Sequence, residues 1–178
     1  MKKYKEISKE NSYRLTGYGP LVLVASIDED GISNVMPVAW NCPVSKEGKF
    51  LVVIGKAHET FKNISNSKKM VICIPHESQK EMVMQTGTNS SRDVYKYDEF
   101  NIKNHLSHSL NIEVPDDCIG YIECKIETIF DGGNTALIVG TCLYAEVDEE
   151  AFEDRLLFEK DCAKTLHHLG GDNFFTSK

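Results

Sequence analysis

The segment from Lys56 to Thr60 brings a cation, an imidazole and a hydroxyl together within one short stretch of chain, through Lys56, His58 and Thr60. It follows an apolar run that ends at Gly55 and precedes a segment with helical spacing, so the amides of a helix N-terminus are expected beside these side chains. Charge, hydrogen bonding and the helix dipole together favour a bound phosphate. The alternative is a solvated turn in which Thr60 caps the helix.

A second polar segment, 88–96, contains several hydroxyl side chains, including Ser91, and two cations, Arg92 and Lys96. The two cations are spaced i, i+4, so both can reach one anion. Asp93 offers either cation a partner within the same segment, and in that case the stretch is an ordinary surface loop. The sequence leaves both interpretations open.

The segment 34–43 contains the only tryptophan of the chain, Trp40, between Pro37 and Pro43. Because Pro37 has no N–H for a sheet ladder, it marks an edge, a bulge or the end of a strand. One interpretation makes Trp40 a core anchor beside a kinked strand. The other presents the backbone amides to a planar polar ligand such as an isoalloxazine ring, which needs peptide donors and acceptors along its pyrimidine edge and apolar cover on one face.

Patterns typical of other chemistries are missing from the sequence. It contains no G-x-S-x-G elbow, no G-x-x-x-x-G-K-[ST] loop and no G-x-G-x-x-G turn, which argues against a serine hydrolase, an ATPase and a Rossmann domain. The pairs His105/His108 and His167/His168 lack further ligands at metal-binding spacing, so no metal site is predicted. The glycines after His168 predict a turn that either carries this imidazole to a ligand or closes the C-terminal part of the fold.

Composition limits the class of protein. The chain has 178 residues, 41% apolar and 26% charged, which predicts a single globular domain over 1–178. Its net charge of −7 argues against a nucleic-acid or anionic-membrane partner. No apolar run is long enough to span a membrane, and residues 6–11 are too polar for a signal peptide, so a cytoplasmic protein is expected. The six cysteines are interpreted as core thiols, with the role of Cys42 left open.

The pattern of apolar residues predicts more strands than helices. Strands are expected at 21–27, 32–35, 50–55, 70–75, 119–130 and 136–145, with tight turns at 28–31 and 131–134. In the strand 119–130, Glu123, Lys125 and Glu127 are expected on a solvated face. Helices are predicted at 59–67, from a capping box at 78–81 to a stop near Gly87, and within 149–164. The expected class is therefore a mainly β protein, an antiparallel barrel with a few helices.

In this order the segments resemble the flavin reductase-like family of FMN-binding split barrels, and within it the flavoredoxin group. The resemblance runs from about Leu15 to Phe175 and is most specific at Asn34-Val-Met-Pro-Val-Ala-Trp40. The other matching segments begin at Gly19, Lys56, Ser91 and His168.

The resemblance implies a Greek-key split barrel that binds FMN as a homodimer, with the flavin near the subunit interface. It implies that 34–40 lies along the ring, that Lys56, His58 and Thr60 serve the phosphate, and that Ser91, Arg92 and Lys96 close over it. His168 rather than its neighbour His167 corresponds to the C-terminal histidine of the family. The implied cofactor-binding residues are Asn34, Val35, Met36, Pro37, Val38, Ala39, Trp40, Lys56, His58, Thr60, Ser91, Arg92, Lys96 and His168.

The resemblance further implies an FMN-dependent oxidoreductase. Electrons would pass from NAD(P)H or a reduced carrier protein to free flavin, a ferric chelate or a partner protein. Since the flavin itself carries the redox chemistry, no catalytic side chain is predicted. One alternative is a non-catalytic flavin carrier with no substrate site of its own, and another is a ligand-binding module of this fold without flavin.

Overall fold

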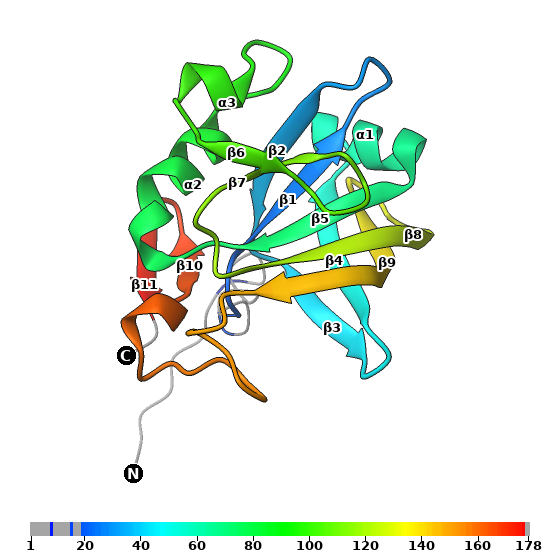
Figure 1. Cartoon of the computed structure of the whole chain (residues 1–178). Coiled ribbons are helices and arrows are strands. Elements are labelled where there is room, and N and C mark those ends of the chain that lie inside the picture. Colours follow the sequence, from blue (N-terminus) through cyan, green and yellow to red (C-terminus); the bar gives the residue numbers. More distant parts are fainter. Residues whose placement is uncertain (1–7, 9–14, 16–18, 177–178) are drawn as a thin grey trace.

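A computed structural model describes residues 8, 15 and 19–176 of the chain, which form an antiparallel β structure with short helices at its rim (Figure 1). The strands are β1 (Val22–Ile27), β2 (Ser33–Val38), β3 (Asn41–Ser45), β4 (Lys49–Gly55), β5 (Lys69–Ile74), β6 (Asn104–Leu106), β7 (Glu113–Pro115), β8 (Gly120–Gly132), β9 (Thr135–Val147), β10 (Leu166–Gly170) and β11 (Asn173–Thr176). The helices are α1 (Glu59–Ser67), α2 (Lys80–Thr88) and α3 (Lys96–Glu99), with 3-10 turns η2 (Glu77–Gln79) and η3 (Asp161–Ala163).

The main sheet is rolled into a split barrel. Its strand order is β2-β1-β5-β8-β9-β4-β3, and every neighbouring pair is antiparallel. The two edge strands, β2 and β3, are separated in the chain by Ala39 and Trp40 alone, so the sheet must curl until its edges meet. The backbone N–H of Val53 in β4 donates to the Trp40 carbonyl at 2.9 Å and extends the β3–β4 pairing into this two-residue link. The predicted antiparallel split barrel is confirmed.

The predicted hairpins form around their expected turns. Asp28 accepts hydrogen bonds from the backbone of Asp30 and Ile32 at 3.0 and 2.8 Å, and Gly31 takes the positive φ of 83° that closes the turn between β1 and β2. The hairpin of β8 and β9 turns at 133–134, with Gly133 at φ 79°.

One expectation for β8 is wrong. Lys125 and Glu127 are exposed as predicted, but the Glu123 side chain is only 2% exposed. Its carboxylate accepts hydrogen bonds from the backbone N–H and the hydroxyl of Ser109, because the loop after β6 covers this part of the strand. Alternation in the sequence could not show that another segment would cover this carboxylate.

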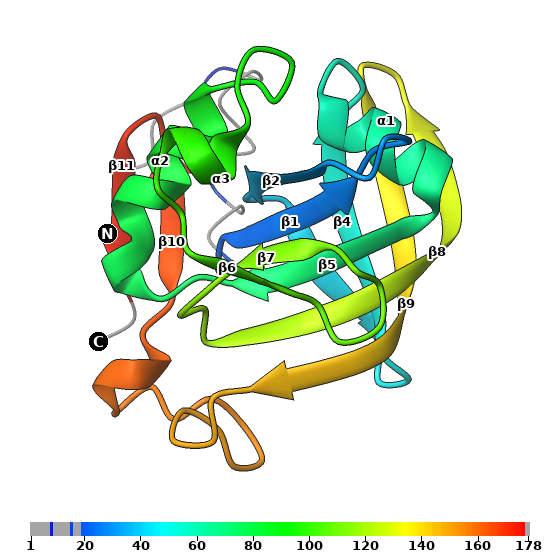
Figure 2. The same cartoon turned by 45° about the horizontal axis from the view of Figure 1, so that its top comes forward.

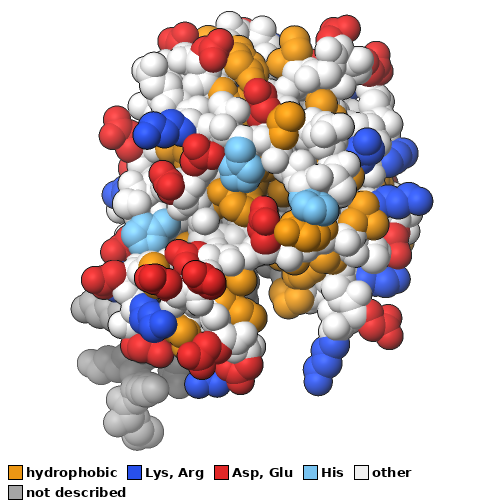
Figure 3. Space-filling model, in the orientation of Figure 1, with side chains coloured by type: hydrophobic (Ala, Val, Ile, Leu, Met, Phe, Trp, Pro, Cys, Tyr) orange, Lys and Arg blue, Asp and Glu red, His pale blue; other side chains and the backbone are white. Residues whose placement is uncertain are grey.

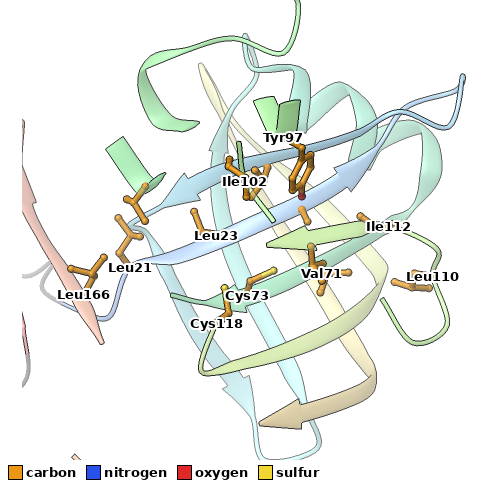
Figure 4. Close-up of a cluster of buried hydrophobic side chains, with 14 residues drawn as sticks. Leu21, Leu23, Val71, Cys73, Tyr97, Ile102, Leu110, Ile112, Cys118 and Leu166 are labelled. Carbon is orange, nitrogen blue, oxygen red and sulfur yellow. The ribbon is translucent and has the colours of Figure 1, made fainter. Parts of the chain in front are cut away.

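Strand β1 is apolar except for Ser26 because both of its faces are buried. Val22 and Val24 point into the barrel. Leu21, Leu23 and Ala25 point outward into a second core under α2, α3 and the β6–β7 hairpin (Figure 4). This outer core fixes the helices against the barrel wall, which places α2 next to β2.

Helix α1 occupies the residues predicted for it. Ile64 is fully buried against the barrel, and Lys68 ends the helix in a left-handed conformation, φ 57°, with its N–H on the Ile64 carbonyl at 3.0 Å. The helix begins directly after His58, whose side chain makes no capping hydrogen bond. Helix α2 and the β10–β11 hairpin lie side by side at the other end of the barrel in both views (Figure 1, Figure 2).

The start and end of α2 differ from the prediction. The capping box is formed by His76 and Gln79 and opens the 3-10 turn η2, instead of by Ser78 and Glu81. The helix also does not stop near Gly87 but continues through it to Thr88. Glycine stands inside the helix here because α2 approaches β2 closely at this residue, as described below.

The helix predicted within 149–164 does not form. The segment is irregular apart from a bridge between Phe152 and Leu156 and the 3-10 turn η3. Three of its larger apolar residues are adjacent at 156–158, only Phe152 lies one helical turn before them, and acidic residues gather at 148–154. This segment is orange in Figure 1, and acidic side chains, red in Figure 3, gather over the same place at the lower left of the molecule.

Candidate functional site

A cleft of about 430 Å³ opens between β2 and β4, beside the two-residue link that follows β2. Its walls come from the end of β2, the end of β4, α2 and the turn between β10 and β11. It is lined by Met36, Pro37, Val38, Ala39, Trp40, Val53, Ile54, Gly55, His58, Gly87, His168, Leu169, Gly170 and Gly171. Strand β2 pairs only with β1, so the backbone along its other edge lies outside the sheet ladder. A mixed apolar and backbone lining suits a flat ligand with polar edges.

Trp40 stands at this cleft and not in the core. Its side chain is 47% exposed, which decides between the two interpretations of the sequence in favour of a cleft residue. Cys42 is exposed and does not line the cleft. All six cysteines are among the described residues, and all are free thiols, of which Cys73, Cys118 and Cys124 are buried.

A smaller polar cavity of about 180 Å³, called here the annex, adjoins the cleft and shares Met36, His58 and Gly87 with it. It lies between the start of α1, the end of α2 and the loop 89–95. Its other lining residues are Asn34, Ala57, Glu59, Thr60, Thr86, Thr88, Asn89, Ser90, Ser91 and Lys96. Hydroxyls, amides and one lysine dominate this lining, in contrast to the cleft.

Asn34 and Thr60 form the floor of the annex. Both are buried, with exposures of 3% and 1%, and the Asn34 amide nitrogen donates to the Thr60 hydroxyl at 2.8 Å. The Asn34 carbonyl oxygen has no hydrogen-bond partner among the described residues. An unsatisfied buried acceptor is costly, so this oxygen indicates a ligand that donates a hydrogen bond to it.

Lys96 supplies the positive charge of the annex. It is 4% exposed, and its ammonium donates to the carbonyls of Val35 and Thr86 at 2.8 and 2.7 Å. Burial lowers the pKa of Lys96 from 10.5 to about 8. Among the described residues no carboxylate pairs with it, and an ammonium has three donors, so one N–H remains for an anion in the annex.

The two other predicted cations, Lys56 and Arg92, line neither cavity. The Lys56 ammonium pairs with Asp131 at 2.7 Å in the turn between β8 and β9. The Arg92 guanidinium pairs with Glu59 and donates to the Ala57 carbonyl at 2.9 Å. The structure therefore separates three cations that the sequence presents as equivalent.

The remaining predicted residues gather around the two cavities. Met36, Pro37, Val38, Ala39, Trp40, His58 and His168 line the cleft, while Asn34, Thr60, Ser91 and Lys96 line the annex, which Met36 and His58 share. Val35 contributes through its carbonyl, which Lys96 binds.

The histidine pair at the C-terminus divides between two sites. His168 faces the cleft, and its Nε2 lies 2.8 Å from the Gly171 carbonyl. His167 lines a separate apolar cavity together with Cys42. The other pair is engaged elsewhere, since His105 contacts Asp116 at 2.7 Å and His108 stacks on Tyr144. Among the described residues no group of three or more potential ligands could hold a metal ion.

Gly87 is a lining residue that sequence reasoning missed. A Cβ at this position would lie 2.8 Å from the Pro37 Cγ, so only glycine lets α2 approach β2 here. Gly55 is similar, because its Cβ would lie 2.9 Å from the His58 ring. A glycine inside a helical pattern is the signal that could have revealed the first of these contacts.

Comparison with known proteins decides the family. Residues 17–167 match the family model described as the flavin reductase like domain. This chain belongs to that family. The match covers most of the sequence, including the cleft segment 34–40 and the annex residues Asn34, Thr60 and Lys96. Family membership supports FMN as the cofactor.

Three relatives illustrate the likeness. The protein YddH of Escherichia coli (strain K12) is 29% identical over 182 residues, covering 99% of this chain and 96% of that protein. The flavoredoxin of Desulfovibrio vulgaris (Miyazaki F) has a TM-score of 0.83 and 19% identity, covering 99% of this chain and 93% of its own. The 2-nitrobenzoate 2-nitroreductase NbaA of Pseudomonas fluorescens has a TM-score of 0.81 and 19% identity, covering 96% and 88%. The two solved structures share the fold of this chain.

No helix in the described residues is long and apolar enough to cross a membrane.

Proposed function

We propose that this protein is an FMN-dependent oxidoreductase that holds the flavin ring in the cleft and the phosphate in the annex. The observation that carries the proposal is a pair of groups in the annex: the Asn34 carbonyl oxygen, which has no hydrogen-bond donor, and the Lys96 ammonium, which binds two carbonyls but no carboxylate. A phosphate and a neighbouring hydroxyl chain are the complementary groups, and FMN carries both. When bound, FMN supplies the redox chemistry, taking electrons from a donor and giving them to an acceptor.

The residues of this chain bind and orient the cofactor. The segment 36–40 and Gly55 bring backbone close to the ring edge, which provides amides for a reduced, negatively charged ring. Lys96, Ser91 and Thr60 face the phosphate, and Asn34 accepts from a hydroxyl of the ribityl chain. His58 stands where the cleft and the annex meet, and His168 covers the opposite side of the cleft.

A further cavity of about 350 Å³, adjoining the cleft, favours an enzyme over a simple flavin carrier. It shares Pro37, Ala39, Gly87, His168 and Gly171 with the cleft and extends to Met84, Asp172 and Phe174. A substrate or nicotinamide in this space would lie directly beside the ring. The proposed donors are NAD(P)H or a reduced carrier protein, and the proposed acceptors are free flavin, a ferric chelate or a partner protein.

We also propose that the protein is a cytoplasmic homodimer. Apolar side chains exposed in and just before the edge strand β3, such as Val44 at 52% and Trp40 at 47%, supply surface for a second copy. Analytical ultracentrifugation measures the state directly, and a monomer at micromolar concentration with FMN bound would contradict the dimer.

The absorption spectrum of the purified protein, before and after adding FMN and removing the excess, tests the cofactor. Retained flavin bands, together with quenching of the single tryptophan, are expected because Trp40 lines the cleft. Protein that lets FMN wash through and shows no quenching contradicts the proposal. Anaerobic titration with NADH, NADPH and reduced carrier proteins then identifies the donor. Steady oxidation of NAD(P)H by the purified protein would identify it as an oxidoreductase, whereas oxidation only with a protein donor would favour a non-catalytic flavin carrier.

A further inference from the structure

Arg92 is held away from the annex by two interactions with the segment that begins α1. Its Nε donates to the Glu59 carboxylate, and a terminal nitrogen of the guanidinium donates to the Ala57 carbonyl at 2.9 Å. Glu59 and Ala57 both line the annex, whereas Arg92 does not. The Arg92 side chain is 61% exposed and the Glu59 side chain only 19%. The arginine thus lies on the solvent side of the glutamate, which separates it from the cavity.

Glu59 is the only acidic side chain among the described residues that line the annex. An unpaired carboxylate there would repel a phosphate and offset the charge of Lys96. Since such repulsion is strong where solvent is excluded, an annex that accepts a phosphate needs Glu59 to be neutralised. The ion pair with Arg92 does this, and it leaves the Lys96 charge for the ligand.

The same interactions fix the loop 89–95 to the start of α1. Ser90 and Ser91 of this loop line the annex opposite Thr60. The Ser90 hydroxyl also accepts the backbone N–H of Arg92 at 3.2 Å, so the loop that presents these serines and the arginine that anchors it form one unit.

We propose, on the basis of the function proposed above, that Arg92 is a positioning residue that neutralises Glu59 and closes the annex, and is not itself a phosphate ligand. Selectivity for FMN over riboflavin then depends on the charge of Glu59, and Arg92 controls that charge. A direct phosphate ligand would behave differently, because its loss could not be compensated at residue 59.

Four variants separate these roles: Arg92→Gln, Glu59→Gln, the two combined, and Lys49→Gln as a matched control. Lys49 forms an exposed ion pair with Glu127 at 2.9 Å and lines neither cavity, so its replacement removes the same charge elsewhere. Dissociation constants for FMN and for riboflavin are measured by fluorescence titration at fixed ionic strength. Thermal unfolding of each variant checks that the fold is intact.

Arg92→Gln is expected to weaken FMN binding about ten-fold, because an unpaired carboxylate then faces the phosphate, while riboflavin binding changes less than about two-fold. Glu59→Gln should bind FMN as tightly as the unsubstituted protein or more tightly. The double variant should recover FMN affinity to within about three-fold, since no carboxylate remains to be neutralised. Lys49→Gln should change neither affinity.

A double variant as weak as Arg92→Gln would overturn the inference and make Arg92 a direct phosphate ligand. Unchanged FMN affinity in Arg92→Gln would overturn it as well. Failure of the proposed function gives a different result, already visible without substitution: the unsubstituted protein would bind FMN no better than riboflavin, or neither of them.

Discussion

The affinity of this protein for FMN is expected to fall as the pH rises through about 8, the pKa to which burial lowers Lys96. Below that pH the buried ammonium is charged and attracts the phosphate, and above it the free protein holds a neutral amine. The phosphate favours the charged form, so binding must raise the pKa of Lys96 again. By linkage, FMN binds with its full affinity at pH values below the pKa of Lys96 in the free protein, and the affinity declines above that pKa.

The size of the effect follows from that pKa and from the ordinary value of 10.5. If the phosphate restores at least the ordinary pKa, linkage predicts that the dissociation constant for FMN rises about 30-fold between pH 7 and pH 9.5, a loss of about 2 kcal/mol. The phosphate itself is a dianion over this range, because its second pKa is near 6. The pH dependence of the FMN dissociation constant therefore reflects the titration of Lys96.

Fluorescence titration at constant ionic strength, with FMN and riboflavin in parallel, measures this dependence. Riboflavin lacks the phosphate, so its affinity should stay within about two-fold across the same range. Lys96→Met, a variant without the titrating ammonium, should bind FMN weakly and with no pH dependence. Parallel curves for the two ligands, or an FMN affinity that does not change with pH, would refute the assignment of Lys96 to the phosphate.

Three further substitutions test the geometry around the cavities. Asn34→Ala should weaken FMN and riboflavin alike, by about ten-fold in titrations, because the unsatisfied carbonyl oxygen is assigned to the ribityl chain that both ligands carry. Gly87→Ala should lower the free energy of unfolding by about 1–3 kcal/mol in urea denaturation, since its Cβ would lie 2.8 Å from Pro37; an unchanged unfolding midpoint would contradict this close packing. Cys42→Ser should retain its rate of NAD(P)H oxidation, because the exposed thiol does not line the cleft, and a complete loss of turnover would indicate a redox role for this cysteine.

The barrel could be predicted because its signals are local. Alternating or continuous apolar runs marked most of its strands, and Asp28 to Gly31 marked the turn between β1 and β2. Strand β3 was missed, since Asn41-Cys-Pro-Val-Ser45 is short, half exposed and contains a proline. The prediction of a helix within 149–164 was wrong because the composition suits a helix, while only Phe152 and Leu156 have helical spacing and the other large apolar residues, Leu157 and Phe158, directly follow Leu156.

The segments of the site could be predicted, but the environment of each side chain could not. Residue type and spacing led to Lys56, Arg92 and Lys96 as equal candidates for an anion. Their partners come from distant parts of the chain: Asp131 for Lys56, and Glu59 for Arg92. Pairing of this kind depends on which loops the fold brings together, and no short pattern in the sequence encodes it.

Burial is what distinguishes the three cations. The Lys56 and Arg92 ion pairs are partly in solvent, where such pairs contribute little, and their positive charges are already compensated. Lys96 is charged at neutral pH although burial disfavours its charge by about 3 kcal/mol, the free-energy equivalent of lowering its pKa from 10.5 to about 8. A phosphate in the annex stabilises the charged form of Lys96 and so offsets this unfavourable burial. FMN carries that phosphate and riboflavin does not, so only FMN gains the corresponding binding free energy. Most of the discrimination between FMN and riboflavin should therefore come from this one lysine, while Arg92 contributes indirectly by neutralising Glu59.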